Sequence, residues 1–271
     1  MSGTDIDYDG LAAGFDEILP LLAPVTDRLA ARTPGLVTGA AVLDVACGTG
    51  EPGLTLAERH GGLRLLGVDA SERMIGIARA KAARRGLFGV RHEVMNAQKL
   101  DVEDRSVDVV VSRFGLLSFA DPAAEAREVE RVLRPGGSVA VATWDAPEAN
   151  TITHALMAAA GASVPAPVKA VTEQQARYAE PGLRESWLRG AGLVDVTSEI
   201  FSWEAGFPDE AALWSLAAGP AMLGAFSPKI DDAIRDAFGA AMAEHRGADG
   251  SYAIPYACRL IFARKNSHLN I

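Results

Sequence analysis

The sequence predicts an α/β protein built on a doubly wound, mostly parallel, seven-stranded sheet with a helical lid. Three observations lead to this prediction. Short apolar runs alternate with helical patterns over residues 41–143, and a glycine-rich turn follows the first run. A helix-like stretch of about 50 residues then separates the last two strand-like runs. No internal repeat or low-complexity linker interrupts this pattern.

Five apolar runs in the first half of the chain are predicted to be parallel strands, because helical patterns separate them. Pro52 suits the first turn of one helix, and Ser71 can cap the next. Asp121-Pro122 opens another helix, which ends at the breaker cluster 134–137. Such sheets have right-handed crossovers and bind ligands beyond the carboxyl ends of their strands. The predicted strands are 41–46, 64–68, 90–95, 106–112 and 138–143.

After Trp144 the pattern changes. Helical patches rich in Ala and Pro come first, and residues 194–203 and 257–263 alternate like strands. The helix-like insertion between those two strands is expected to form a lid or pocket wall. The predicted units are 1–40, an N-terminal helical segment over the active site; 41–144, the ligand-binding core; and 145–271, the remaining core strands with helical lid insertions at about 145–180 and 204–252.

The composition argues against several classes of protein. The 271 residues carry a net charge of −9, and an acidic surface repels phosphate backbones, so no nucleic-acid partner is expected. The densest basic stretch, from Arg79 to Arg85, falls on a predicted amphipathic helix and is expected to be a solvated face. Cys47 and Cys258 form no disulfide framework, and no cluster suggests a metal site. Without a signal peptide or a long apolar run, the chain is expected to be cytoplasmic with no membrane span; its oligomeric state is not indicated.

The segment from Val42 to Gly53 runs from an apolar strand through a glycine loop into a helix. Gly48 and Gly50 allow a tight turn and a close backbone approach to a ligand, and the helix start offers free N–H groups. The three glycines of this segment also fit a dinucleotide fingerprint. Asp44 argues against a dinucleotide, because a carboxylate beside the loop suits a cationic amino-acid group and repels a pyrophosphate.

The ends of the next three strands carry further candidate ligand-binding residues. An acid at the end of the second strand can accept hydrogen bonds from ribose hydroxyls. Met74, one turn into the following helix, is a candidate to pack on an adenine ring, with core packing as the alternative. The polar end of the third strand is a candidate for the adenine edge, with a turn-forming Asn as the alternative. Arg113 ends the fourth strand, where a solvent ion pair is the alternative role. The candidates are Asp69, Ala70, Met74, Asn96, Ala97, Gln98 and Arg113.

Residues 42–144 resemble a class I S-adenosylmethionine-dependent methyltransferase, in particular the ubiquinone/menaquinone-biosynthesis-type branch of small-molecule methyltransferases. The likeness rests on the segments VLDVACGTGEPGLTLA, GVDASERMIGIARAKA, NAQKLDVEDRSVDVVVSRFGLLSFAD and EVERVLRPGGSVAVATW. Tyr8-Asp9 with Phe15-Asp16 resembles the N-terminal motif of that branch. The resemblance implies a Rossmann-like methyltransferase fold, S-adenosylmethionine as the cofactor, and an antiparallel seventh strand at 257–264.

The resemblance also implies a role for individual residues. The loop from Asp44 to Gly50, with Ala46 and Gly48, would hold the methionine end of the cofactor. Asp69, beside Ala70, would bind the ribose, and residues 96–98 would flank the adenine. Asn96 departs here from the commoner Asp of the family. Tyr8 and Arg113 would lie near the methionine carboxylate or the pocket mouth.

The chemistry of the cofactor limits what the protein must supply. A sulfonium methyl is already activated, so the protein must mainly align a nucleophile and exclude water. A base is needed only when the nucleophile arrives protonated. His154, on the helix predicted after the fifth strand, is the candidate base, and a non-catalytic histidine is the alternative.

We therefore expect methyl transfer to a small, largely apolar metabolite, such as a quinone, a polyketide or another secondary metabolite. Three alternatives stay open at this stage. The first is cyclisation or rearrangement with the cofactor bound structurally. The second is a nicotinamide-dependent oxidoreductase, suggested by the glycine spacing alone. The third is a non-catalytic binding protein.

Overall fold

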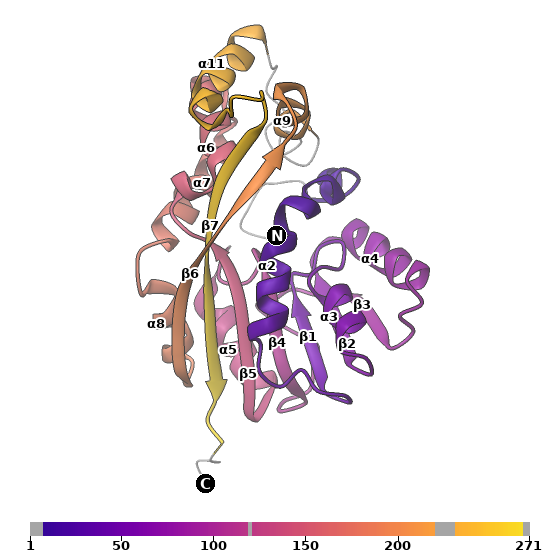
Figure 1. Ribbon diagram of the computed structural model, residues 1–271. Coiled ribbons are helices and arrows are strands. Elements are labelled where there is room, and N and C mark those ends of the chain that lie inside the picture. The colour runs from indigo at the N-terminus through magenta and orange to yellow at the C-terminus, as the bar shows by residue number, and fades with distance from the viewer. Residues whose placement is uncertain (1–7, 119–120, 220–230, 268–271) are drawn as a thin grey trace.

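The computed structural model describes residues 8–118, 121–219 and 231–267, which fold around one seven-stranded sheet (Figure 1). The strand order is β3-β2-β1-β4-β5-β7-β6, with β1 to β5 parallel and β7 antiparallel to both of its neighbours. This confirms the predicted fold class. The strands are β1 (Ala41–Val45), β2 (Arg64–Asp69), β3 (Val90–Val94), β4 (Val107–Arg113), β5 (Leu133–Trp144), β6 (Leu193–Phe207) and β7 (Tyr252–Lys265).

The helices begin where the sequence provides caps. The Ser71 side chain accepts a hydrogen bond from the Met74 N–H, and Asp121 does the same for Ala124, as their residue types predict. The α-helices are α1 (Tyr8–Leu11), α2 (Leu19–Arg32), α3 (Gly53–Arg59), α4 (Glu72–Arg84), α5 (Pro122–Val132), α6 (Thr151–Ala160), α7 (Ala166–Tyr178), α8 (Leu183–Gly190), α9 (Glu210–Ala217) and α11 (Asp232–Met242). Short 3-10 turns are η1 (Phe15–Ile18), η2 (Pro147–Ala149), η3 (Gly161–Ser163) and η4 (Ala243–His245). None of the described helices is long and apolar enough to cross a bilayer.

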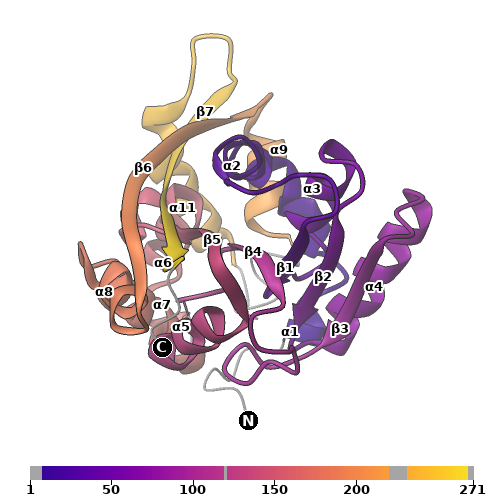
Figure 2. The same ribbon diagram turned by 90° about the horizontal axis from the view of Figure 1, so that it is seen from below.

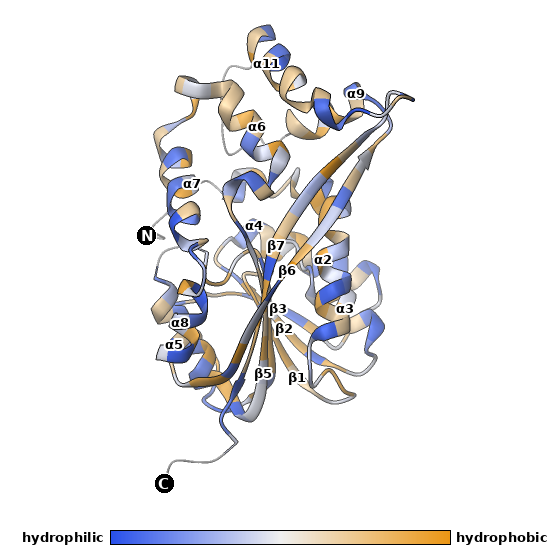
Figure 3. Ribbon diagram, turned by 60° about the vertical axis from the view of Figure 1, so that its left-hand side comes forward, coloured by the Kyte–Doolittle hydropathy of each residue, from blue (hydrophilic) through white to orange (hydrophobic). Residues whose placement is uncertain are grey.

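The core lies on both faces of the sheet, since successive side chains of a strand point to opposite sides. In β4, Val109 and Val111 pack on the face that α2 and α3 cover, while Val110 packs on the face that α5 and α8 cover (Figure 2). A strand buried on both faces must be apolar throughout, which explains the unbroken apolar runs of the sequence. Figure 3 accordingly shows hydrophobic colour along the strands and both colours on the helices.

The last two strands are longer than the sequence predicts. Antiparallel pairing of β6 with β7 runs from Leu193 opposite Lys265 to Phe207 opposite Tyr252. This ribbon extends out of the sheet toward α9 and α11 (Figure 1), where buried side chains such as Trp203 pack in one core with α6, α9 and α11. Residues 204–207 of the predicted lid insertion are therefore strand. Residues 220–230 of that insertion, and 1–7 of the predicted N-terminal segment, lie outside the described residues.

The fifth strand also begins earlier than predicted. The sequence places a breaker at 134–137 and a strand from Ser138, whereas β5 starts at Leu133. Leu133 pairs with Val107 of β4 before a register shift, so the Pro-Gly-Gly run is a bulged part of the strand. The breaker still ends α5, whose last residue is Val132.

Candidate active site

The glycine loop leaves β1 at the carboxyl edge of the sheet and enters α3 at Gly53. Its backbone takes positive φ values at Ala46 (55°), Gly48 (52°) and Gly50 (107°). A Cβ at Gly50 would lie 2.6 Å from Leu54 Cδ1, so this position requires glycine for space as well as for backbone angle. The sequence prediction of a tight turn at the end of the first strand is confirmed.

Asp44 lies beneath this loop and is fully buried. Its Oδ2 accepts a hydrogen bond of 2.8 Å from the Gly53 N–H, which fixes the first turn of α3. Its Oδ1 is buried and has no hydrogen-bond partner among the described residues. Burial raises the pKa of Asp44 to about 8, against the lowering effect of the Gly53 N–H and of Arg113. An orphaned acceptor at this place fits a site that a donor from a bound ligand completes.

Asp69 joins the ends of β1 and β2. Its two oxygens accept hydrogen bonds of 2.9 Å each, one from the Gly48 N–H and one from the Ser71 N–H. Burial raises its pKa, although these N–H groups act in the opposite direction. Tyr8 of α1 lies close by, and its pKa is raised by burial and by the charge of Asp69. The structure thus brings together the predicted residues Tyr8, Gly48 and Asp69; their contacts with a cofactor stay a prediction, as does the role of the exposed Ala70.

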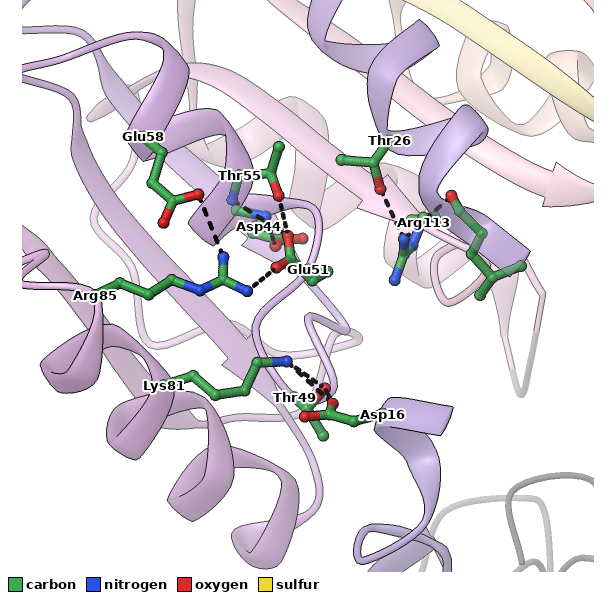
Figure 4. Close-up of polar contacts among 12 residues, drawn as sticks. Asp16, Thr26, Asp44, Thr49, Glu51, Thr55, Glu58, Lys81, Arg85 and Arg113 are labelled. Atoms are coloured by element: carbon green, nitrogen blue, oxygen red, sulfur yellow. Dashed lines mark hydrogen bonds and ion pairs between the residues drawn. The ribbon is translucent and has the colours of Figure 1, made fainter. Parts of the chain in front are cut away.

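A polar latch holds the N-terminal segment against the loop (Figure 4). The Lys81 ammonium of α4 lies 3.0 Å from Asp16 Oδ1 and 3.3 Å from Thr49 Oγ1, and the Thr49 hydroxyl donates to Asp16 at 2.6 Å. Lys81 is only 5% exposed. The prediction that this basic stretch is a solvated face is therefore wrong at Lys81, because the covering residue, Asp16, lies 65 positions away in the sequence.

Apolar contacts also hold the N-terminal segment against this part of the molecule. Met74, expected to pack on an adenine, is 2% exposed and forms a small buried cluster with Leu11 and Ala12 of the N-terminal segment. Tyr8 and Phe15 pack against this cluster. The core role, which was the alternative for Met74, is therefore the one seen, and its contact with adenine stays a prediction.

At the end of β3 the backbone turns at Asn96. The Asn96 Oδ1 accepts a hydrogen bond of 2.9 Å from the Gln98 N–H, and its carbonyl accepts one of 2.9 Å from the Lys99 N–H. Asn96 is exposed, whereas Ala97 and Gln98 are half-buried. The turn-forming role of Asn96 is thus present, and the role of this segment at an adenine stays a prediction.

Arg113 ends β4 beneath α2 (Figure 4). Its Nη1 donates 2.7 Å to Thr26 Oγ1 and 3.4 Å to the Leu22 carbonyl, and the residue is 8% exposed. Burial lowers its pKa to about 10, while Glu51 and Asp44 favour its charge. The alternative of a solvent ion pair is therefore wrong, because Arg113 is buried and fixes α2 on the sheet; its place near a bound cofactor stays a prediction.

The candidate base receives no support from its position. Helical periodicity buries Ile152, Ala155 and Leu156 of α6 and leaves His154 exposed on another face. No hydrogen bond or ion pair of the His154 side chain is found within the described part of the chain. Its catalytic role stays a prediction without a contact that favours it.

An aromatic stack marks the edge of the sheet beside the loop. The rings of Phe114, which follows β4, and Trp144, the last residue of β5, are 4.0 Å apart between centroids and inclined by 11°. Trp144 also lies 6.5 Å from Trp203, which stacks on Tyr256 at 5.4 Å. Phe114 and Trp144 are partly exposed. Their place at two strand ends was the only signal for them in the sequence.

Comparisons with known proteins agree with this geometry. A family model described as a methyltransferase domain matches residues 42–137. A demethylmenaquinone methyltransferase from Clavibacter sepedonicus is 28% identical over 203 residues, which cover 70% of this chain and 81% of that protein. One from Thermus thermophilus is 41% identical over 106 residues, 39% of this chain and only 48% of that protein. The crystal structure of the cyclase SpnF has a TM-score of 0.58 at 22% identity, covering 99% of this chain and all of the other.

The sheet with its antiparallel seventh strand, the glycine loop and the acid at the end of β2 are features of the Rossmann-like methyltransferase fold. Residues 42–137 match a methyltransferase domain, whose cofactor is S-adenosylmethionine, and the chain is similar to methyltransferases of the quinone-biosynthesis type. The nicotinamide alternative, which rested on glycine spacing alone, has no support among these findings.

Proposed function

We propose that this protein transfers the methyl group of S-adenosylmethionine to a small, largely apolar acceptor with a flat ring, such as a quinol or a related secondary metabolite. The observation that supports this acceptor class is the partly exposed Phe114–Trp144 stack, at the same sheet edge as the glycine loop. Aromatic side chains favour offset stacking with flat partners. Relatives named demethylmenaquinone methyltransferases point to the same class.

The residues around the loop fit the two ends of the cofactor. Asp44, with its unpaired Oδ1, and the loop backbone would hold the amino-acid end, and Asp69 would hold the ribose, with Tyr8 close by at the pocket mouth. Bound there, the cofactor supplies a methyl group that is already activated for in-line displacement. The protein's own contribution is then alignment and the exclusion of water. The apolar cluster around Met74 and the latch at Lys81 close the N-terminal segment over this edge and serve that exclusion.

Calorimetric titration with S-adenosylmethionine, S-adenosylhomocysteine and NADH tests the cofactor first. We expect the first two to bind and NADH not to bind. Asp69→Ala should weaken the binding of S-adenosylmethionine and of S-adenosylhomocysteine by on the order of tenfold or more, since it removes the proposed hydrogen-bond acceptor for the ribose hydroxyls. Asp101→Ala, at an exposed acid in the connection between β3 and β4, is the matched control. Binding of NADH alone would reject the proposal.

The acceptor is then tested by mass spectrometry of reaction mixtures that contain reduced, short-chain demethylmenaquinone. The expected product is heavier by one methyl group in place of a hydrogen, with one S-adenosylhomocysteine released for each product. A second candidate is cyclisation or rearrangement with the cofactor bound structurally, since the cyclase SpnF shares this fold. Turnover of an acceptor without release of S-adenosylhomocysteine would favour that reaction over methyl transfer.

A further inference from the structure

The loop after β4, residues 114–118, has a strained backbone. Phe114 and Leu117 take φ values of 65° and 60°, which L-residues with large side chains rarely adopt. Such conformations persist only where the surroundings over-determine them, and they cluster at functional sites. Leu117 is fully buried, so water does not satisfy its peptide groups.

Two side chains from different helices hold the Leu117 backbone on both sides. Glu125 of α5 accepts a hydrogen bond of 2.7 Å from the Leu117 N–H. Arg184 of α8 donates from Nε to the Leu117 carbonyl at 3.3 Å. Because the N–H and the carbonyl of Leu117 are each hydrogen-bonded to one of these side chains, Glu125 and Arg184 hold Leu117 in its strained conformation.

The same guanidinium reaches the next strand. Arg184 Nη1 donates to the carbonyl of Trp144 at 3.0 Å. One planar group therefore joins the loop after β4, which carries Phe114, to the end of β5, which carries Trp144. The spacing of these rings is tied to a residue 40 positions after Trp144 in the sequence.

The burial of Glu125 and Arg184, which together clamp the Leu117 backbone, costs free energy of folding. Arg184 is 1% exposed and Glu125 is 4% exposed. Burial lowers the pKa of Arg184 to about 10 and raises the pKa of Glu125 to about 8. Asp145 and Glu185 favour the charge of Arg184, and Arg259 opposes it. Buried charges are often no more stabilising than apolar residues of the same size, and their attested use is to specify one arrangement.

We propose that Glu125 and Arg184 are positioning residues, which clamp the β4 loop and thereby set the Phe114–Trp144 wall against the methyl acceptor. This inference rests on the proposed function for the acceptor, but the clamp itself concerns only residues of this chain. Both side chains are buried and hydrogen-bond to backbone groups. Their effect passes through the Leu117 backbone and the Trp144 carbonyl.

Fluorine NMR of the protein labelled with 5-fluorotryptophan tests the clamp without any acceptor. The four tryptophans give four resonances, of which Trp214 in α9 is an internal reference. We expect Arg184→Met and Glu125→Leu to shift or broaden the Trp144 resonance and to leave Trp214 unchanged. Glu125→Gln, which keeps an acceptor for the Leu117 N–H, should restore the native resonance. Arg189→Met is the matched control, since Arg189 lies exposed on α8 and also donates to a carbonyl, that of Val196, at 3.0 Å.

Steady-state kinetics with reduced short-chain demethylmenaquinone tests the consequence. In Arg184→Met and Glu125→Leu, displacement of the Phe114 and Trp144 rings by a fraction of an ångström should raise the acceptor KM by on the order of tenfold. The dissociation constant of S-adenosylhomocysteine should change less than about twofold. A native Trp144 resonance in both Arg184→Met and Glu125→Leu would overturn the proposal, as would an unchanged acceptor KM. If one variant fails to fold, the other decides. If the wild type does not turn over this probe, the proposed acceptor is wrong, and the NMR result alone decides the clamp.

Discussion

Replacement of Gly115 by alanine should uncouple the loop after β4 from the glycine loop after β1. A Cβ at Gly115 would lie 2.2 Å from the Ala46 Cβ, 3.3 Å from its carbonyl oxygen and 3.5 Å from its Cα. Ordinary contacts begin at 3.4 Å, so the two backbones must separate by about 1.2 Å (3.4 − 2.2). Ala46 already has a φ of 55°, which leaves it little freedom to move away.

The size of the effect follows from that displacement. Overpacking of this kind costs roughly 1–3 kcal/mol in the free energy of unfolding. A shift of about 1 Å in the loop that we propose to bind the cofactor should also lower the affinity for the cofactor by on the order of 10–100-fold. Urea unfolding measures the first quantity, and calorimetric titration with S-adenosylhomocysteine measures the second.

Gly76→Ala is the matched control for this prediction. Gly76 lies inside α4, and a Cβ there would meet nothing within 4 Å. Alanine should stabilise that helix by about 0.5–1 kcal/mol and leave cofactor affinity unchanged. Wild-type affinity in Gly115→Ala would refute the reasoning, because it would mean that contact with Ala46 does not position the glycine loop.

Three further outcomes are expected. Lys81→Met should speed the dissociation of S-adenosylhomocysteine severalfold in stopped-flow measurements, because it removes the ion pair that latches the N-terminal segment; Arg84→Met, on the exposed face of the same helix, should not. Arg113→Met should lower the free energy of unfolding by about 1–3 kcal/mol, since Thr26 and the Leu22 carbonyl lose a buried donor; equal urea midpoints would contradict this. His92 is 3% exposed, and burial, with the nearby charge of Arg79, lowers its pKa to about 4. Because the unfolded histidine has a pKa near 6.5, the unfolded chain binds the extra proton between about pH 4 and 6.5. Stability should therefore be full above about pH 6.5 and fall by up to roughly 3 kcal/mol as the pH drops toward 4, and His92→Leu should flatten that dependence in urea titrations.

The geometry of the glycine loop and of Asp69 was predictable because its signals are local. A glycine loop after an apolar strand, and an acid at the end of the next strand, each lie within a few residues of the element that positions them. Parallel strands then bring Gly48 and Asp69 to one edge, where the structure joins them by a hydrogen bond of 2.9 Å. Caps such as Ser71 were predictable for the same reason, since the capped N–H lies three residues away.

The burial of charged residues was not predictable in this way. Lys81 and Arg113 are covered by the N-terminal segment. Arg184 bonds the end of β5, 40 positions before it, and the loop after β4, 67 positions before it. A helical pattern states which residues share a face, but it does not state what that face meets. His154 shows the same limit, because α6 packs through Ile152 and Leu156 and leaves the histidine in solvent.

By itself, the sequence determined the fold class, the order in which parallel strands and helices alternate, and the tight glycine loop after the first strand. Alternation of strand and helix and the demands of tight turns are properties of neighbouring residues. Only the tertiary structure decided the length of the β6–β7 ribbon, the latch at Lys81 and the clamp that joins Leu117 to Trp144. These depend on which distant segments meet, and the free energy of such contacts is set by burial and partners rather than by residue type alone.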